Sequence, residues 1–322
     1  MLSTEPDDAK ADYVRLAQYE LRDELGSGQY GVVRAVRCSE TNKDYAMKII
    51  SKRRLMKRKI NHTNLVKLVD VLDAPGDGML YMVFELLPNG ETLRIPSEEP
   101  LSEEKARSYF RDTLQGLDYL HYQYIIHRDI KPANLLLDAN NNVKISDLGV
   151  SVEVEDSYLI SGQVGTPAFM SPELLNPDSG KLSGVCVDLW ALGVTLFAFL
   201  AGTVPWNDIT SIGILNKIMT QPLNFSSINP PISRDCEELI QQMLSIDMDE
   251  RPTTDSLFKN NWVLATGELG ARCHEYVDVT DEDVNSSVTT VPKLETLIMV
   301  KQMLKRHSFR NPFTLNRQTS QF

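Results

Sequence analysis

The sequence lacks the features that mark secreted, zinc-stabilised and membrane-spanning proteins. Its four cysteines lie far apart in the chain, at Cys38, Cys186, Cys236 and Cys273. This spacing predicts neither a disulfide framework nor a zinc site. The first ten residues lack the basic and then apolar order of a signal peptide. The longest apolar run, residues 189–201, is shorter than the roughly 18 residues that span a bilayer, so we expect it to be a buried helix. The cysteine spacing and the lack of a signal peptide lead us to expect a cytoplasmic or nuclear protein.

Acidic residues are missing from two stretches of a chain that is otherwise rich in them. The formal net charge is -11, which disfavours nonspecific nucleic-acid binding. Yet no Asp or Glu occurs between Asp44 and Asp70, and residues 52–59 in that interval are strongly basic. A second basic stretch covers residues 301–317. The ordinary interpretation of residues 52–59 is a solvated basic surface, with nuclear import or anion binding as alternatives.

The remaining composition is typical of a globular protein with one large domain or two lobes. Short strand-like runs over residues 19–50 and a second strand pair around the turn at residues 74–78 predict a small antiparallel sheet. From the N-cap residue Ser102 onward, apolar residues recur at helical spacing. We expect an acidic leader at 1–18, a strand-rich part at 19–88, a helical part at 89–264, an acidic linker at 265–290 and a tail at 291–322.

Three glycines, Gly26, Gly28 and Gly31, lie where two predicted strands turn. Because glycine has no side chain, the backbone there can approach phosphate oxygens closely. The pattern alone is weak, since ordinary hairpin turns share it, and a dinucleotide-binding fold would need a helix where Val32 continues a strand. Lys48 lies in the next predicted strand, where a cation would meet the α and β phosphates, although an isolated strand lysine is usually only solvated.

A far more specific motif is HRDIKPAN at residues 127–134. Its five fixed residues would occur together by chance in about one chain in 10^4 of this length. These residues are His127, Arg128, Asp129, Lys131 and Asn134. Asp147 and Gly149 follow after a strand-like run, and a Ser-Pro-Glu sequence ends at Glu173. This context makes a capped turn that happens to contain the motif a poor alternative.

These residue types suit phosphoryl transfer, in which a protein chiefly positions groups and neutralises charge. Asp129 would accept or orient the proton of a substrate hydroxyl, and Lys131 would lie near the γ-phosphate. Asn134 and Asp147 offer the hard oxygen ligands that magnesium prefers. The predicted cofactors are therefore ATP and Mg2+, with Lys48, Asp129 and Lys131 as the catalytic residues.

In this order, across residues 19–262, the motifs resemble those of the eukaryotic Ser/Thr protein kinase family. The resemblance implies an α+β, bilobal protein kinase fold with a small β-rich N-lobe and a larger helical C-lobe. It implies nucleotide contacts from Leu25, Gly26, Gly28, Gly31, Val33, Ala46, Lys48, Phe84, Glu85, Leu87 and Leu136. It implies structural or regulatory roles for His127, Arg128, Gly149, Thr166, Glu173, Asp188 and Arg251. Within that set, Glu173 should pair with Arg251, and Asp188 should brace the catalytic loop.

A narrower resemblance is to the calmodulin-dependent protein kinase kinases. It rests on LVKLVDVLDAP, LYMVFELL, LHYQYIIHRDIKPANLLL and VGTPAFMSPE, and on the tail from YVDVTDEDV to HSFRNPF. The resemblance implies a monomeric upstream kinase whose protein substrate is another kinase. It also implies a regulatory tail at 291–322 that inhibits the kinase and binds a calmodulin-like Ca2+ sensor, which releases it. Physically, residues 294–304 form an apolar helix face beside basic residues, which also suits a membrane surface or a helix docked on its own domain.

The activation segment, residues 147–173, carries Gly162 four residues before Thr166, where many kinases carry a phosphorylated threonine. We therefore predict that activity does not require phosphorylation there, with Ser161 as the nearby alternative site.

The sequence departs from the family pattern between Lys48 and His62. The family places there a helix with a glutamate that pairs with the lysine, whereas Arg53 occupies about that position and a full helix does not fit. Three explanations compete: a transcript or gene prediction that lacks an exon, which we favour, a true kinase that steadies Lys48 otherwise, and a pseudokinase scaffold. Misplacing Lys48 by itself would slow turnover by roughly 10^2 to 10^3.

Overall fold

The computed structural model describes residues 15–28, 31–51, 61–73, 79–148, 151–154, 158–176, 180–272 and 288–290. Gly149, residues 52–60 with Arg53, and the tail at 291–322 lie outside the described residues. The chain forms two compact units. The first comprises the described parts of Met1–Lys57, Lys67–Leu86 and Val279–Phe322, and the second those of Arg58–Val66 and Leu87–Asp278.

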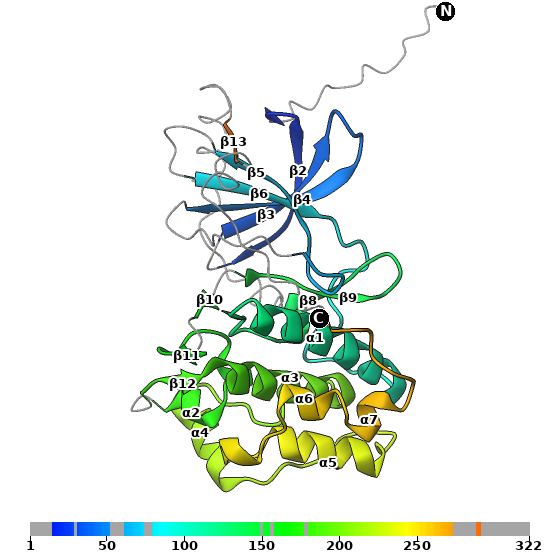
Figure 1. Cartoon of the computed structure of the whole chain (residues 1–322), viewed down its shortest axis with the longest axis vertical. Helices are drawn as coiled ribbons and strands as arrows, with labels where there is room; N and C mark the ends of the chain where they lie inside the picture. Colours follow the sequence, from blue (N-terminus) through cyan, green and yellow to red (C-terminus); the bar gives the residue numbers. More distant parts are fainter. Residues whose placement is uncertain are drawn as a thin grey trace, which may run out of the picture. The chain divides into compact units, whose positions relative to one another are not determined.

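The first unit is one seven-stranded sheet with the strand order β1-β2-β3-β4-β6-β5-β13. Most of its strands are labelled in Figure 1. Its strands are β1 (Arg15–Leu16), β2 (Tyr19–Gly28), β3 (Gly31–Cys38), β4 (Asp44–Ser51), β5 (Leu68–Asp73), β6 (Met79–Glu85) and β13 (Val288–Thr290). All neighbours pair antiparallel except β13, which joins β5 in parallel. The antiparallel sheet predicted from strand patterning is confirmed, whereas β13 was not predicted.

One face of this sheet forms an apolar core. Met47 and Ile49 alternate along β4 with half-buried residues, as expected for a strand with one face buried. They pack in a cluster with Val36, Tyr81 and Val83 from the neighbouring strands. The opposite face of the sheet is thereby left to Ala46 and Lys48, which occupy the alternate positions of β4.

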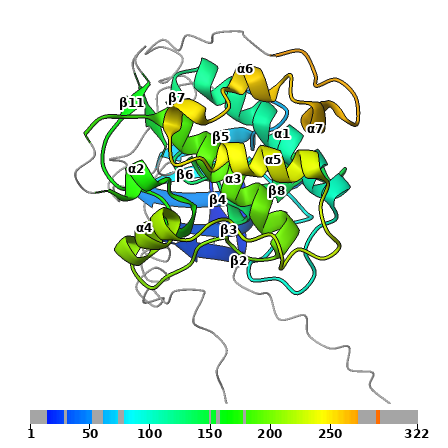
Figure 2. The same ribbon diagram turned by 90° about the horizontal axis from the view of Figure 1, so that it is seen from below.

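The second unit is mainly helical (Figure 2). Its longer helices are α1 (Glu103–Tyr122), α3 (Gly184–Ala201), α4 (Ser211–Thr220) and α5 (Arg234–Met243). Its short helices are α2 (Pro172–Leu175), α6 (Thr254–Leu257), α7 (Asn261–Leu264), η2 (Pro132–Asn134), η4 (Pro167–Phe169) and η5 (Met248–Glu250). Ser102 caps α1 as predicted, because its hydroxyl accepts a hydrogen bond from the Lys105 amide.

Helix α3 forms the centre of the second unit and packs beside α1. The Phe199 ring meets Tyr109 of α1 edge to face, with 5.9 Å between centroids. By length and hydropathy α3 could cross a membrane, but 83% of it is buried in the unit, so it is a core helix. It begins at Gly184, five residues before the apolar run seen in the sequence, because Ser183 caps the amide of Cys186.

Three short strand pairs fix the loops that precede and follow the HRDIKPAN motif. They are β7 (Ile125–Ile126) with β10 (Val152–Glu153), β8 (Leu135–Leu137) with β9 (Val143–Ile145), and β11 (Leu159–Ile160) with β12 (Leu182–Ser183). The motif itself begins directly after β7 and ends with η2, which β8 follows at once. Short strands at both ends therefore hold a loop whose own backbone is irregular.

Candidate active site

The Asp129 carboxylate is the centre of the site in the second unit. Its Oδ2 accepts hydrogen bonds from Lys131 Nζ at 2.8 Å and from Asn134 Nδ2 at 2.9 Å. Its Oδ1 accepts from the Thr166 amide at 2.9 Å and the Thr166 hydroxyl at 2.7 Å. Lys131 Nζ also donates to Thr166 Oγ1, at 2.5 Å. Four donors from two segments thus hold one carboxylate, and the structure brings Asp129, Lys131, Asn134 and Thr166 together.

A second carboxylate, Asp188 on α3, holds the backbone of the loop that carries the HRDIKPAN motif. Asp188 is fully buried. Its Oδ1 accepts from the Arg128 amide at 2.8 Å, and its Oδ2 accepts from the His127 amide at 2.9 Å. His121 Nε2 of α1 lies 2.8 Å from the same Oδ2. Arg128 adopts a positive φ of 66°, a conformation rare for residues with a side chain, and these bonds supply the contacts that hold it there.

His127 joins the loop to the strand that follows it. Its ring is buried, with Nε2 at 3.0 Å from the Ser146 carbonyl and Nδ1 accepting from the Asp129 amide at 3.2 Å. A carbonyl oxygen only accepts, so Nε2 must carry the proton, and Nδ1 must be the acceptor. A neutral imidazole in this tautomer satisfies both partners.

The predicted metal ligands Asn134 and Asp147 are linked through Ser146. The Ser146 amide and hydroxyl both donate to the Asn134 carbonyl, at 2.8 and 2.9 Å. Asn134 Nδ2 donates to the carbonyl and the carboxylate of Asp129. Because both amide protons are used, the Asn134 Oδ1 is the group left to bind a cation. Asp147 follows Ser146 with a positive φ of 57°.

Gly165 lets the activation segment approach the catalytic loop. Its φ is +121°, and a Cβ built there would lie 2.3 Å from the Arg128 carbonyl oxygen. No side chain fits at that distance. The next residue, Thr166, makes the two bonds to Asp129, so the absence of a side chain at Gly165 is what permits them.

The ion pair expected between Glu173 and Arg251 is present. Arg251 Nη1 and Nη2 donate to the two Glu173 oxygens at 2.7 and 2.8 Å, which is the bidentate geometry that suits guanidinium and carboxylate. The Arg251 side chain is buried, and its guanidinium lies 4.7 Å from the Trp190 ring centroid. This pair ties the end of the activation segment to the turn after α5.

In the first unit, several predicted nucleotide contacts share one face of the sheet. Val33 pairs with Lys48, and Ala46 pairs with Phe84. Residues directly opposite each other on neighbouring strands point to the same face, and this is the face opposite the core residue Met47. Gly26 pairs with Val33, which brings the glycine-rich turn to the same strands.

The other predicted nucleotide contacts are distributed between the units. Gly28 and Gly31 are paired across the β2–β3 turn, and Leu25 of β2 is 53% exposed. Glu85 ends β6, and its carboxylate accepts from the Lys67 amide at 2.9 Å. Leu87 and Leu136 belong to the second unit, where Leu136 of β8 pairs with Lys144. Their joint role in nucleotide binding stays a prediction.

Sequence reasoning missed an anchor that precedes β5. Asn64, which is buried, donates from its side chain to the Val143 carbonyl at 3.0 Å, and its carbonyl accepts from the Ile145 amide at 2.8 Å. The His62 ring stacks on Tyr119 of α1, with 5.0 Å between centroids. Residues 61–66 therefore group with the helical unit rather than with the strands on either side of them. The short His-Thr-Asn sequence was the available signal.

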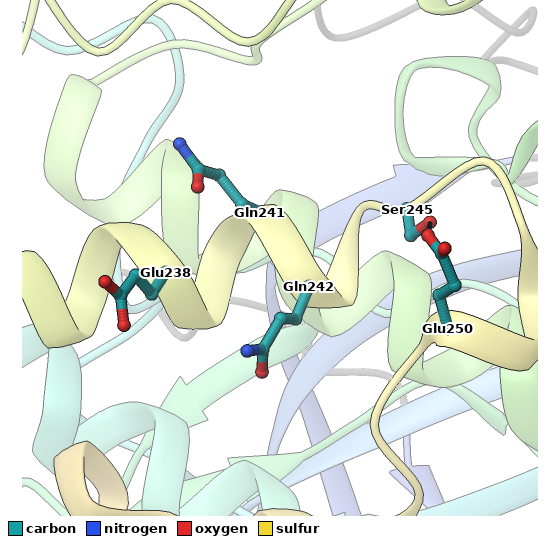
Figure 3. Close-up of a pocket in the computed structure, with 5 residues that line it drawn as sticks. All are labelled: Glu238, Gln241, Gln242, Ser245 and Glu250. Carbon is teal, nitrogen blue, oxygen red and sulfur yellow. Dashed lines mark hydrogen bonds between the residues drawn. The ribbon is translucent and has the colours of Figure 1, made fainter.

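A surface hollow of about 410 Å³ lies between α5 and the turn that contains η5 (Figure 3). It is lined by Glu238, Gln241, Gln242, Ser245 and Glu250. Ser245 donates to Glu250 at 2.8 Å. None of the residues of the HRDIKPAN motif lines this hollow, so it carries no argument about the chemistry.

The residues that surround Asp129 have the arrangement expected of phosphoryl-transfer enzymes, and comparison with known proteins agrees. The family model described as "Protein kinase domain" matches residues 19–263, about three quarters of the chain. The chain belongs to the protein kinase family. A calcium/calmodulin-dependent protein kinase kinase of Caenorhabditis elegans is 41% identical over 94% of this chain and 63% of its own length. The serine/threonine-protein kinase ssp1 of Schizosaccharomyces pombe is 35% identical over 91% of this chain and 50% of its own length.

These two kinases are longer than the chain, which spans between half and two thirds of each. The alignment with the Caenorhabditis elegans kinase covers 345 positions, more than the 322 residues of the chain. That kinase therefore carries positions with no counterpart here.

Proposed function

We propose that this kinase-family chain transfers the γ-phosphate of ATP to a serine or threonine hydroxyl of a protein, using Mg2+. The observation that carries the proposal is the Asp129 carboxylate held by Lys131, Asn134 and Thr166. This geometry fixes three groups in one hydrogen-bonded cluster. They are a proton acceptor (the Asp129 carboxylate), a positive charge (the Lys131 ammonium) and an amide oxygen (Asn134 Oδ1). Phosphoryl transfer needs such fixed positions more than it needs covalent chemistry by the protein.

Each residue then has a definite role. Each oxygen of Asp129 already accepts two hydrogen bonds from protein donors, so a substrate hydroxyl must replace one of these donors. The Thr166 hydroxyl can rotate away to make room for it. Asp129 then accepts the proton of the substrate hydroxyl. Lys131 offsets charge on the transferred group, and Asn134 and Asp147 present oxygens to the metal ions. When bound, Mg-ATP supplies the phosphoryl group and the charge that neutralises it.

The same proposal extends to a phosphate-independent activation segment. The segment is paired to the unit by β11 and β12, and Tyr158 stacks on Tyr124 at 5.2 Å between centroids. Gln163 Nε2 donates to the Leu175 carbonyl at 2.7 Å. These contacts, which involve protein groups alone, support the proposal. Ser161→Ala should keep wild-type turnover, whereas activity that tracks phosphate on Ser161 in mass spectrometry would contradict this.

The similarity to a calmodulin-dependent protein kinase kinase favours an upstream kinase of the cytoplasm or nucleus that acts on other kinases, with calmodulin binding by the tail. A peptide of residues 290–315 should bind calmodulin in calcium and not in EGTA. No binding in calcium would remove the calmodulin role and leave the kinase proposal intact.

The missing acid between Asp44 and Asp70 favours a second candidate, a catalytically silent scaffold. The test is turnover of the full chain with Mg-ATP and a peptide from the activation loop of another kinase, with Asp147→Asn as the matched variant. Turnover that Asp147→Asn abolishes supports the enzyme. Wild-type turnover no higher than that of the variant supports the scaffold.

A further inference from the structure

The outer edge of strand β5 is occupied by a segment from near the other end of the chain. On its inner side β5 pairs with β6, with Val71 opposite Met82. On its outer side β13 runs parallel to it, with Val288 opposite Val71 and Thr290 opposite Asp73. The two strands are separated by more than 200 residues. Residues 291–322, the predicted regulatory tail, follow β13 directly.

Strand β5 presents an edge that needs a partner. An uncovered edge strand exposes a row of amide and carbonyl groups, and apolar side chains on it add to the risk of pairing with another chain. The strand has the sequence LVDVLD. The docked segment pairs with Val71, Leu72 and Asp73, while Leu68 and Val69 just before them remain 40% and 42% exposed. An apolar edge of this kind is suited to β-strand addition, in which a peptide supplies the missing main-chain partners.

The sequence around β13 suits that role. Residues 288–291 read VTTV, a run of β-branched residues that favour extended backbone. Pro292 follows at once, and proline cannot donate a backbone hydrogen bond to a ladder. The sequence therefore favours a short strand that ends before the basic, apolar tail begins.

A second anchor holds the chain shortly before this strand. Arg272 donates to Asp118 of α1 and to Asp255 of α6, and its guanidinium lies 4.8 Å from the Phe258 ring centroid. Arg111 of α1 donates to the carbonyls of Gly267 and Glu268 at 2.8 Å. Only residues 273–287 separate this anchor from β13.

We propose that the outer edge of β5 is a docking site for this chain's own residues 288–290, and that this docking is the latch that holds the tail on the first unit. The docking itself stands on the strand pairing, while its regulatory meaning rests on the proposed function of the tail. A three-residue strand makes few main-chain bonds, so the latch is reversible. Its position fixes where residues 291–322 start.

The test is hydrogen–deuterium exchange of the full-length chain, read at the amides of residues 68–73. Successive amides of a strand point to opposite sides, so Val288→Pro with Thr289→Pro must remove a donor from the ladder. The matched control, Val288→Thr with Thr289→Val, keeps both donors and the β-branched character. We expect exchange in β5 to become about tenfold faster or more in the proline variant and to stay unchanged in the control.

Unchanged exchange in the proline variant would overturn the proposal. Protection of β5 that is lost on dilution of the wild-type chain would also overturn it, because the occupant would then be a second copy. Faster exchange without any change in basal turnover would support the docking and contradict the regulatory role of the tail. Calmodulin binding by the tail peptide with unchanged exchange would support the proposed function and remove the latch.

Discussion

The catalytic loop of the second unit and the glycine-rich strands of the first unit are held by different means. In the loop, carboxylate side chains hold both side chains and backbone amides: Asp129 accepts four bonds, and Asp188 accepts two backbone amides of the same loop. In the sheet, the register of β3, β4 and β6 places Val33, Lys48 and Phe84 through main-chain pairing. The loop therefore depends on the chemistry of particular side chains, and the sheet depends chiefly on backbone geometry.

The largest expected effect is on the loop side of this comparison. In Asp129→Asn, one amide N–H group must face donors from Lys131 and Asn134 or from Thr166. The proton acceptor and its partners are lost together, so we expect turnover to fall by roughly 10^2 to 10^4. Steady-state kinetics with Mg-ATP measure this. A fall of less than tenfold would show that Asp129 is not the proton acceptor.

The second largest effect concerns the ion pair between Glu173 and Arg251 at the end of the activation segment. Glu173→Gln leaves the buried Arg251 charge without its carboxylate, which costs about 3 kcal/mol of unfolding free energy. Chemical denaturation measures the loss. The matched control is Glu238→Gln, which removes the exposed pair with Arg234 and should not change the midpoint measurably. Equal effects of the two substitutions would contradict this ranking.

The third prediction compares one glycine from each region. Alanine at Gly165 or at Gly31 would place Cβ 2.3 Å from the Arg128 carbonyl or 2.1 Å from the Ile49 carbonyl, both with positive φ. Each substitution should cost about 1 to 3 kcal/mol of stability. Gly165→Ala should also lower turnover, because it displaces Thr166 from Asp129. Gly26→Ala is the control, since no atom lies within 4 Å of its added Cβ.

The smallest effect is a pH dependence at the anchor before β5. Burial lowers the pKa of His62 below its ordinary value of 6.5, with the Lys144 charge acting in the same direction and the Asp118 charge opposing them. In the pH range just below 6.5 the unfolded chain therefore binds more protons at His62 than the folded chain does. The free energy of unfolding is then highest above this range and decreases as the pH falls through it. Thermal unfolding at pH 7.5 and 5.5 should show a smaller shift in His62→Gln than in wild type.

An equal shift in the two proteins would mean that carboxylates alone cause the acid sensitivity. A larger shift in His62→Gln would contradict the direction of the pKa change.

The two regions also differ in how far the sequence predicts them. The chemistry of the loop requires His127, Asp129 and Asn134 at fixed spacing, so the motif is recognisable from the order of residues alone. The glycines and Lys48 give only a weak pattern, because a hairpin turn needs the same residues for other reasons. Their assignment depends on the resemblance of the whole chain to a family.

Contacts between distant segments are the hardest to foresee. The anchor of Asn64 on β9 and the addition of β13 to β5 join residues that are about 80 and more than 200 positions apart. No local sequence pattern predicts which distant segment will pair with a given strand, since any strand-forming segment can pair with an exposed edge strand. From their position between predicted strands, residues 61–66 are expected in the strand-rich part at 19–88. The structure instead groups them with the helical unit.

By itself, the sequence determined the family, the two kinds of secondary structure, the capped start of α1 and the residues around Asp129. These follow from local periodicity and from chemistry that tolerates few substitutions. Only the tertiary structure decided that Thr166 shares the Asp129 carboxylate with Lys131, that Gly165 permits this approach, and that residues 288–290 complete the sheet. Such facts depend on distances between remote backbone segments, which folding sets and which sequence spacing does not encode.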